Sequence, residues 1–542
     1  MKMTGAQILV EGLRREGVDQ VFGYAGATIC AIMDVFRECS DLGYTLVRTE
    51  QNAGHMASGY ARVTGKVGVC IVTSGPGATN LMTGVATAYM DSIPMVAITG
   101  QVPSNLIGRD IFQEVDVTGA GTAFSKHSYL VKDAAQLPRI IKEAFYIAST
   151  GRPGPVLIDI PSDIQEQVVD VEFPEEVDIR GYRPSVRGNE KQIDHVAEAI
   201  RAAKQPVICA GGGVFLADAI SELKQFAEHA GIPIVTTMMG LSLLPTDYPL
   251  NLGMIGSHGS ACANKALAKS DLLIMIGTRV ADRTILSPEE IHRRMPSIHI
   301  DVDPAEIGKN IQPELPLVGD AKVILGQLLE RDIRADAGEW LTQLQQRRAE
   351  ELAKEPPFRA DSVSPGRLLR CLGQKLKEDS AVCVDVGQNQ IWACRNLWLK
   401  GNRLLTSGGL GTMGYSLPAA IGVKKAQPDR QTVVVCGDGS FQMSMNELAA
   451  IRAADLDIKI VMIRNGILGL VHQIQNSSAY HGAFGVALDG SPDYAALAAA
   501  YGIDSITVSR DEDVEQALER LLGQPGACLL IADVDPACQT ND

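Results

Sequence analysis

The sequence predicts an α/β protein made of three doubly wound domains, each built on a parallel sheet, and three observations lead to this prediction. Apolar segments of strand length alternate with helical segments along the 542 residues. Two charged, aperiodic stretches, at about 168–191 and 356–366, divide this alternation into thirds. The first and last thirds follow the same order of strands and turns. We therefore expect domains at residues 1–167, 190–333 and 364–542.

In the first third, Thr4 and Gln7 form a capping box that starts a helix carrying Ile8, Leu9 and Leu13. Strands and helices then alternate, which is typical of a parallel sheet covered by helices on both faces. Strands are expected at 21–26, 44–48, 67–72 and 94–100, and the helices between them run through Phe36, from about Gln51 and from Gly77.

The second third repeats the alternation and ends in a charged helix at 339–355, and the last third resembles the first. Because ligands bind at the carboxyl ends of strands in such sheets, we expect functional residues at those ends. Strands are expected at 206–213, 232–240, 271–279, 297–304, 381–387, 403–409, 432–439, 458–466 and 528–535.

Composition excludes several classes of protein. The hydrophobic and charged fractions, 46% and 21%, are those of a globular chain rather than a disordered or fibrous one. A net charge of -15 disfavours binding to nucleic acid. No apolar run approaches the roughly 18 residues of a membrane helix, and the first residues do not form a signal peptide. Eleven cysteines without a CxxC pair, four of them in apolar strands (Cys70, Cys209, Cys383 and Cys436), indicate reduced thiols in a cytoplasmic protein.

The strongest chemical signal is a Gly-Asp-Gly-Ser turn at a strand end, followed by an asparagine at the end of the next strand. Asp438 alone could be a helix cap, and that is the simpler interpretation of a single acid in a turn. Asn465 favours a ligand site over a helix cap, because the side chains of Asp438 and Asn465 can meet at one sheet edge. With the Ile467 carbonyl they supply the hard oxygen ligands that Mg²⁺ prefers, and a diphosphate could complete its octahedron.

Two further features have alternative interpretations. Glu50 could be an acid in the first turn of a helix, where the helix dipole favours it, or it could bond a ring nitrogen of a bound heterocycle. Gly409, Gly411 and Gly414 spell GxGxxG, but the motif does not lie in a first βα turn, so the fingerprint for dinucleotides is weak here. Met413, inside this motif, could be core filler.

Several motifs together resemble one family. GDGSFQMSMNEL followed by Asn465, TEQNAGHMASGYAR and TSGGLGTMGYSLPAAIG are similar to motifs of the thiamine-diphosphate enzymes. GRPGPVLIDIP, IFQEVD and HIDVDPAEIGKN more closely resemble the catalytic large subunits of acetolactate synthase. The resemblance covers nearly the whole chain and implies a pyrimidine-binding domain, a central FAD-type domain and a diphosphate-binding domain, in that order. It also implies that pyruvate is decarboxylated and its two-carbon unit is passed to a second 2-oxo acid, in branched-chain amino acid biosynthesis.

The resemblance assigns roles to residues around thiamine diphosphate. Asp438, Asn465 and the Ile467 carbonyl would hold Mg²⁺, and Glu50 would bond the pyrimidine ring and favour its imino tautomer. Met413 would be the apolar wedge that bends the cofactor, and Ala27 and Gln113 would act on the substrate. Further contacts to the cofactor would come from Gly387, Gln388, Asn389, Gly411, Gly437, Gly439 and Ser440.

The resemblance also implies FAD with a structural role in the central domain. Two arginines flanking a pyrophosphate make chemical sense, although the glycine-rich turn could be only a tight strand–helix connection. Ala281 stands where an acid is usual between those arginines. The matching positions are Arg152, Gly211, Gly212, Gly213, Thr237, His258, Gly277, Arg279, Arg283, Asp301 and Asp320.

The sequence departs from the family pattern in three places. Residues 25–28 read Ala-Gly-Ala-Thr instead of Pro-Gly-Gly-Ala, which keeps the Ala27 N–H but narrows its φ range. Ile474 replaces a tryptophan that favours 2-oxobutyrate, so we expect pyruvate to be the preferred acceptor. Related chains continue with a tail that covers the active site, whereas this sequence ends at ADVDPACQTND.

The resemblance implies a homo-oligomer, a dimer at least and possibly a tetramer, because Glu50 and the metal site of one cofactor come from different subunits. A small regulatory subunit is a further possible partner. The alternatives are another thiamine-diphosphate carboligase or 2-oxo acid decarboxylase, and a catalytically weak paralogue. A dehydrogenase function would be supported only by the GxGxxG motif. Lys126 and His127 are interpreted as a solvated turn.

Overall fold

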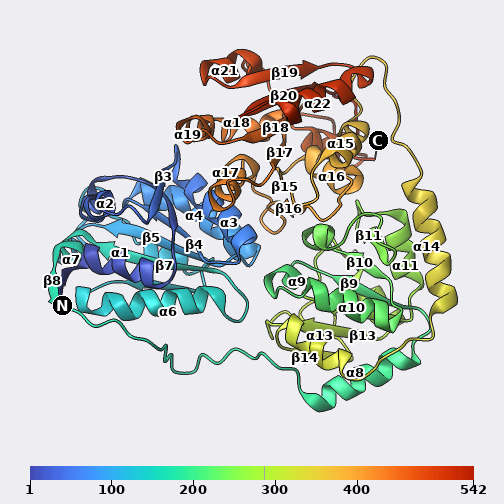
Figure 1. The fold of residues 1–542 in the computed structure, drawn as a ribbon, viewed down its shortest axis with the longest axis horizontal. Helices are drawn as coiled ribbons and strands as arrows, with labels where there is room; N and C mark the ends of the chain where they lie inside the picture. The colour runs from blue at the N-terminus through green and yellow to red at the C-terminus, as the bar shows by residue number, and fades with distance from the viewer. Residues whose placement is uncertain (286, 542) are drawn as a thin grey trace.

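The structure is a computed structural model that describes residues 1–285 and 287–541. It contains three six-stranded sheets, and every strand pairing within them is parallel (Figure 1). Helices lie on both faces of each sheet, so the predicted α/β class with three doubly wound domains is confirmed.

The N-terminal domain has the strand order β3-β2-β4-β5-β7-β6. Its first helix, α1 (Gly5–Arg15), begins with the predicted capping box of Thr4 and Gln7. The other elements are β2 (Gln20–Tyr24), η1 (Ala27–Ile29), α2 (Cys30–Arg37), β3 (Gly43–Leu46), α3 (Glu50–Thr64), β4 (Gly68–Val72), α4 (Pro76–Met90), β5 (Met95–Gln101), η2 (Ser104–Leu106), α5 (Val117–Gly121), β6 (His127–Leu130), η3 (Ala134–Gln136), α6 (Leu137–Ser149), β7 (Pro155–Pro161) and α7 (Ser162–Glu166).

The central domain has the order β11-β10-β9-β12-β13-β14, in which the winding reverses between β9 and β12. Ligands of open α/β sheets bind at such a reversal. Its elements are α8 (Glu190–Ala202), β9 (Pro206–Ala210), α9 (Gly213–Leu216), α10 (Ile220–Ala230), β10 (Ile234–Thr236), η4 (Met238–Leu243), β11 (Asn251–Met254), α11 (Ala261–Lys269), β12 (Leu272–Ile276), α12 (Pro288–Arg294), β13 (Ser297–Asp301), β14 (Leu315–Val318), α13 (Ala321–Leu329) and α14 (Gly338–Leu352).

The C-terminal domain has the order β16-β15-β17-β18-β20-β19, which is the order of the N-terminal domain strand for strand. The internal repeat expected from the sequence is therefore present in the topology. Its elements are α15 (Pro365–Lys375), β15 (Ala381–Val384), α16 (Gln388–Asn396), β16 (Arg403–Leu405), α17 (Ser416–Ala426), β17 (Thr432–Gly437), α18 (Asp438–Gln442), η5 (Met445–Glu447), α19 (Leu448–Ala453), β18 (Ile458–Arg464), α20 (Gly469–Gln475), α21 (Tyr494–Ala500), β19 (Asp504–Val508), η6 (Asp511–Asp513), α22 (Val514–Gly523) and β20 (Cys528–Asp533).

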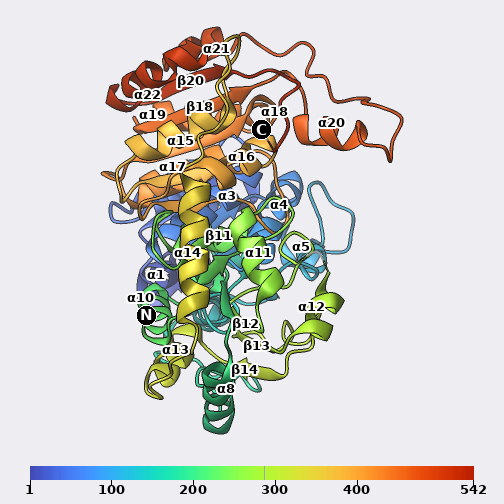
Figure 2. The ribbon, with the colours of Figure 1, turned by 90° about the vertical axis from the view of Figure 1, so that its right-hand side faces the viewer.

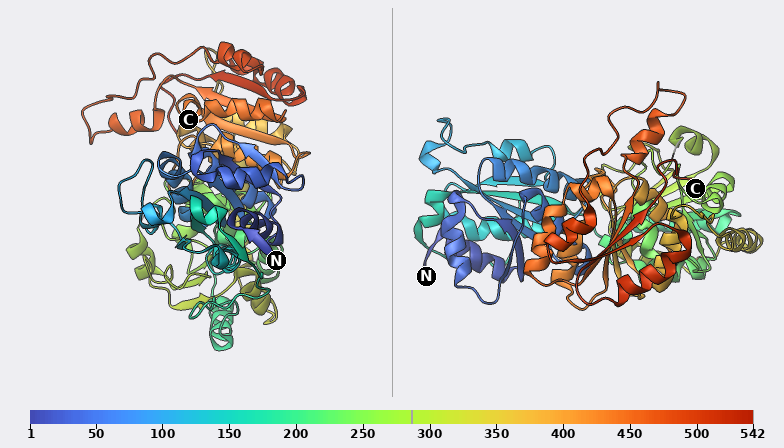
Figure 3. Two further views of the ribbon diagram at one scale, coloured as in Figure 1. Left: turned by 90° about the vertical axis from the view of Figure 1, so that its left-hand side faces the viewer. Right: turned by 90° about the horizontal axis from the view of Figure 1, so that it is seen from above.

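The two similar domains lie side by side and share one hydrophobic core (Figures 1 and 3). Helices α3 and α17 form the joint, where glycines permit close approach. A methyl group added to Gly59 would lie 2.1 Å from the Ala419 carbonyl oxygen, and one added to Gly422 would lie 1.9 Å from that of Met56. Across the same joint the Ser58 and Tyr415 hydroxyls are 3.0 Å apart.

Of two sequence-based expectations, one needs a correction and the other is wrong. The described residues 171–189 have no helix or strand, as expected of a linker, but the stretch at 168–191 begins with a strand, β8 (Val168–Asp170), which pairs antiparallel with β1 (Lys2–Thr4); three-residue strands are too short to show periodicity. Lys126 and His127 are not a solvated turn, because His127 opens β6 and Lys126 donates to the carbonyl of Thr150 and the hydroxyl of Tyr182. Burial lowers the pKa of Lys126 to about 8.

The cysteines are as expected: none of the eleven forms a disulfide in the described part of the chain, and Cys70, Cys209, Cys383 and Cys436 are buried. Across residues 1–285 and 287–541, the structure has no helix that combines the length and the apolar character needed to cross a membrane.

Candidate active site

Glu50 lies at the carboxyl end of β3, where it is the first residue of α3. Its Oε2 accepts a hydrogen bond of 3.0 Å from Asn80 Nδ2 on α4. Its Oε1 lies 3.5 Å from the position that a methyl group on Gly77 would take, so the glycine leaves room beside the carboxylate. Glu50 is half-buried, and Oε1 is the atom available to a ligand at this edge.

The Ala27 loop lies against the turn after β4. Thr28 Oγ1 is 2.9 Å from Thr73 Oγ1 and accepts from the Ser74 N–H at 3.0 Å. Ala27 begins η1, and it is not among the residues with positive φ. An L-residue therefore fits this position without strain, and the Thr28 hydroxyl anchors the altered loop.

Gln113 lies in the loop after β5 and has a positive φ of 63°. It packs on Gly75, whose added methyl group would lie 3.0 Å from Gln113 Cβ. The loop is held by Gln101, which donates to the Val115 carbonyl at 2.8 Å and to Asp159 Oδ2 at 3.0 Å. Burial raises the pKa of Asp159 to about 7. The structure thus brings Glu50, Ala27 and Gln113 to one edge of the N-terminal sheet.

Asp438 and Asn465 follow the neighbouring strands β17 and β18 and meet over one turn. Asp438 Oδ2 accepts from the Gly466 N–H at 2.8 Å, and Asn465 Oδ1 accepts from the Ile467 N–H at 3.2 Å. Asp438 is 2% exposed, and burial raises the pKa of its carboxyl group. Among the described residues no lysine or arginine forms an ion pair with Asp438; the charge of Arg464, which pairs with Asp533, acts on it from farther away.

The turns beside this corner are shaped for close approach of a ligand. Gly387 has a φ of 141°, and Asn389 Nδ2 donates to the Asp385 carbonyl at 2.6 Å. The Gly437 N–H donates to Ser440 Oγ at 3.1 Å, which closes the turn at the start of α18. Gln388 and Asn389 are both buried, and they face the same corner as Gly437 and Asn465.

Met413 belongs to the loop between β16 and α17. A methyl group added to Gly439 would lie 3.7 Å from Met413 Cε, so this side chain lies beside the Gly437–Ser440 turn. Asp385, a buried residue that was not predicted as part of the site, holds this loop. It accepts from the N–H groups of Gly414 and Ser416, each at 2.9 Å. An acid directly after an apolar strand was the available signal.

In this chain Glu50 and Asp438 are not joined by any hydrogen bond or ion pair between the described residues. Among the contacts between the two domains is that of Glu447, whose Oε1 accepts from the Arg48 N–H and from Asn52 Nδ2, both at 2.8 Å. Burial raises the pKa of the Glu447 carboxyl group.

A cavity of about 880 Å³ opens at the carboxyl ends of the central strands, where the winding reverses. The turns after β9 and β12 approach closely: a methyl group added to Gly213 would lie 2.7 Å from Gly277 Cα. All three domains contribute to its wall. The predicted residues that line it are Arg152, Gly212, Gly213, Thr237, Gly277, Arg279, Arg283, Asp301, Asp320 and Gly411.

Two predicted residues do not line this cavity. A methyl group added to Gly211 would lie 2.2 Å from the Gly277 carbonyl oxygen, so this glycine serves the packing of the two turns. His258 lies near Arg283, and its Nδ1 is buried without a hydrogen-bond partner. Gly411, which the resemblance assigns to cofactor binding, lies on the wall of this cavity.

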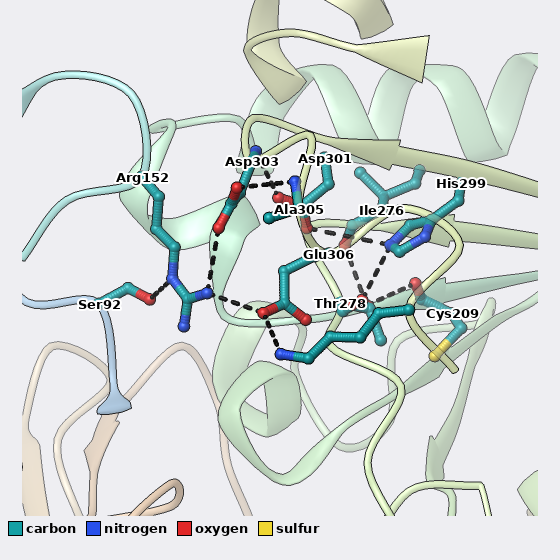
Figure 4. A network of polar contacts seen from close by, with 11 residues as sticks. Ser92, Arg152, Cys209, Ile276, Thr278, His299, Asp301, Asp303, Ala305 and Glu306 are labelled. Atoms are coloured by element: carbon teal, nitrogen blue, oxygen red, sulfur yellow. Dashed lines mark hydrogen bonds and ion pairs between the residues drawn. The ribbon is translucent and has the colours of Figure 1, made fainter. Parts of the chain in front are cut away.

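Figure 4 shows a polar network that includes four residues of the cavity wall, Ser92, Arg152, Asp301 and Glu306. Arg152 Nη1 lies 3.2 Å from Asp303 Oδ2 and 2.8 Å from Glu306 Oε1, and its Nε donates to Ser92 Oγ. Asp301, at the end of β13, accepts from the Asp303 N–H, and burial raises its pKa to about 6. The network joins the N-terminal domain to the central one, because Ser92 and Arg152 belong to the first and the acids to the second.

The chain matches three family models. They are the N-terminal TPP binding domain of thiamine pyrophosphate enzymes over residues 3–120, the central domain over 193–328 and the C-terminal TPP binding domain over 385–532.

Curated relatives are similar along nearly the whole chain. An acetolactate synthase of Arthrospira platensis is 42% identical over 98% of this chain and 94% of its own length. The acetolactate synthase large subunit of Corynebacterium glutamicum is 42% identical over 96% and 84%. The isozyme 3 large subunit of Escherichia coli is 40% identical over 96% and 92%.

Proposed function

Because the chain belongs to the acetolactate synthase large subunits of the thiamine pyrophosphate enzymes, we infer that it is an acetolactate synthase. Its reaction is the decarboxylation of pyruvate and the transfer of the two-carbon unit to a second 2-oxo acid, which gives 2-acetolactate when that acid is pyruvate, in the biosynthesis of the branched-chain amino acids valine, leucine and isoleucine. The observation that carries this proposal is similarity over nearly the whole chain together with Glu50, Asp438 and Asn465 at the carboxyl ends of two sheets of identical strand order.

Thiamine diphosphate, when bound, supplies the electron sink for decarboxylation and carbon–carbon bond formation. Glu50 is the residue of this chain that would act on the pyrimidine ring of the cofactor. Asn80 occupies Oε2 and orients the carboxyl group, so Oε1 is left to hold a proton against a ring nitrogen. The Ala27 N–H and the Gln113 side chain lie at the same edge, where they can orient a carbonyl or carboxylate of the substrate.

Mg²⁺ fits the corner formed by Asp438, Asn465 Oδ1 and the Ile467 carbonyl. The donor set consists of hard oxygens, and the buried Asp438 charge has no cationic side chain in an ion pair within the described part of the chain. The Gly387 and Gly437–Ser440 turns would contact the diphosphate, and Met413 would press on the cofactor from beside Gly439.

FAD fits the central cavity. Its volume suits a dinucleotide, its glycine turns lie at the reversal of the winding, and Arg279 and Arg283 supply charge for a pyrophosphate, whereas the charge of Arg152 is already paired with Asp303 and Glu306. Asp301 at the end of β13 can accept from a ribose hydroxyl. The role we propose for FAD is structural, because it would touch all three domains.

We propose a homodimer or a tetramer in the cytoplasm, in which Glu50 of one subunit and Asp438 of another face one cofactor. Within one chain, α3 contacts the C-terminal domain through its packing on α17 and through the Asn52–Glu447 hydrogen bond, not through Glu50. Apolar side chains at the site edges, Phe112 and Phe484, are 87% and 88% exposed, which suits cover by a second copy. Since relatives are named large subunits, a small regulatory subunit is a further proposed partner.

The test is an assay of purified protein with pyruvate and Mg²⁺, with and without thiamine diphosphate, that scores acetolactate. Cofactor-dependent acetolactate is expected, and flavin fluorescence after denaturation should report bound FAD. Acetaldehyde or a different acyloin as the product would identify a sibling decarboxylase or carboligase. Cofactor binding without turnover would identify a weak paralogue.

A further inference from the structure

The segment after β20 folds back over α16. We call residues 534–541 the C-terminal segment. Its Cys538 and Thr540 are 1% and 0% exposed. Trp392 Nε1 donates to the Gln539 carbonyl at 2.9 Å, and Gln388 Nε2, one turn earlier on α16, donates to the Cys538 carbonyl at 3.0 Å. The segment is therefore packed on the helix that begins at the diphosphate turn.

The segment also fixes the amide of Gln473 on α20. Gln473 Nε2 donates to Thr540 Oγ1, and Gln473 Oε1 accepts from the Thr540 N–H, both at 3.1 Å. These two bonds allow one orientation of the amide, because only its nitrogen carries hydrogens. In that orientation Gln473 Oε1 lies 3.4 Å from Gln388 Nε2.

Gln388 is consequently oriented from one side by two acceptors. Its Nε2 faces the Cys538 carbonyl and Gln473 Oε1, so its Oε1 must face the other way. There it accepts from Asn465 Nδ2 at 3.1 Å. The Asn465 nitrogen is thereby occupied, and its Oδ1 is turned toward the Ile467 N–H on the side of Asp438.

We propose that the C-terminal segment is a positioning element for the metal ligand Asn465, acting through Gln473 and Gln388 to keep the amide oxygen rather than the nitrogen toward the ion. This inference rests on the proposed metal site. An amide turned by 180° would direct N–H groups at a cation, so the orientation decides whether Asn465 is a ligand at all.

The first test measures the dissociation constant of Mn²⁺ in the presence of thiamine diphosphate, on the full-length protein. Thr540→Val keeps the side-chain shape and removes the acceptor of Gln473, and deletion of residues 538–542 removes the whole contact. We expect about tenfold weaker Mn²⁺ binding for the deletion and a smaller loss for Thr540→Val, as for other groups that orient metal ligands. The control is Asn541→Ala, which loses only an exposed bond to Arg395 and should bind Mn²⁺ like the parent.

The decisive test repeats Thr540→Val in an Asn465→Asp background. A carboxylate offers an oxygen in either orientation, so the segment should no longer affect Mn²⁺ affinity there. Equal weakening in both backgrounds would overturn the proposal, and so would unchanged affinity of Thr540→Val in the parent. If the parent does not bind Mn²⁺ in the presence of thiamine diphosphate, the proposed metal site is wrong, which is a different result from a failure of the role given to the C-terminal segment. Thr540→Val carries the test if the deletion does not fold.

Discussion

The N-terminal and C-terminal sheets have the same strand order and different chemistry at their carboxyl ends. After its second strand the first sheet has Glu50, bonded to Asn80, whereas the second has the loop of Met413. After its third and fourth strands the second sheet has Asp438 and Asn465. Topology therefore fixes where the ligand-binding edge of each sheet lies, and the loop residues at that edge decide whether it binds a heterocyclic ring or a metal ion.

The largest effect is expected for Glu50→Gln. The amide keeps the shape and can still accept from Asn80, but it cannot hold a proton against a ring nitrogen in the same way. Acetolactate formation should fall by about 10²–10⁴-fold at unchanged thermal stability. The exposed Glu38→Gln is the matched control, and parental turnover of Glu50→Gln would remove the role given to that residue.

Asp438→Asn tests the other edge. Loss of the carboxylate should weaken Mn²⁺ binding by about 100-fold or more in the presence of thiamine diphosphate. The folded-state pKa of Asp438 is raised by burial, so its charge costs stability above the unfolded pKa when no cation is bound. The variant without cofactor should therefore melt at a higher temperature than the parent. The exposed Asp489→Asn should change neither quantity; a lower melting temperature for Asp438→Asn would contradict the charge argument.

Ile474→Trp tests acceptor preference at the C-terminal domain, from which α20 projects (Figure 2). Ile474 is 50% exposed, so a larger ring can be accommodated there. Aromatic contact with one extra methyl group should shift acceptor preference toward 2-oxobutyrate by about 10-fold. Competition between pyruvate and 2-oxobutyrate measures the ratio of products. More acetohydroxybutyrate than acetolactate from the parent at equal concentrations would refute its expected bias to pyruvate.

The smallest expected effect concerns the buried acid of the N-terminal sheet. The folded pKa of Asp159 is about 7, above an unfolded value of roughly 3.9. Between these values the folded state holds the extra proton, so this group lowers stability as pH rises from about 4 to 7. Asp159→Asn should gain stability relative to the parent across that range in denaturant titrations. The exposed Asp34→Asn is the control, and its plot of unfolding free energy against pH should run parallel to that of the parent. A parallel plot for Asp159→Asn would reject the raised pKa of Asp159.

The strands that sequence pattern predicts and those that it misses differ in their place in the sheets. The expected apolar runs correspond to central strands such as β4, β12 and β17, which are buried on both faces. The missed strands of the three six-stranded sheets, β6, β11, β14 and β19, are edge strands, which need no continuous apolar run; the other two edge strands, β3 and β16, were predicted. Strand β7 lies within the GRPGPVLIDIP motif, for which no strand was predicted.

The sequence alone determined the fold class, the repeat, the family and the residues at the strand ends, because apolar periodicity and strand-end motifs are local along the chain. Only the tertiary structure decided what holds those residues. Asp385 under the Met413 loop, Thr28 against Thr73, and Thr540 behind Gln473 are separated in sequence by between 29 and 67 residues from the groups they bond. Hydrogen bonds of this kind depend on atomic distance and direction, which no local pattern of residue types records.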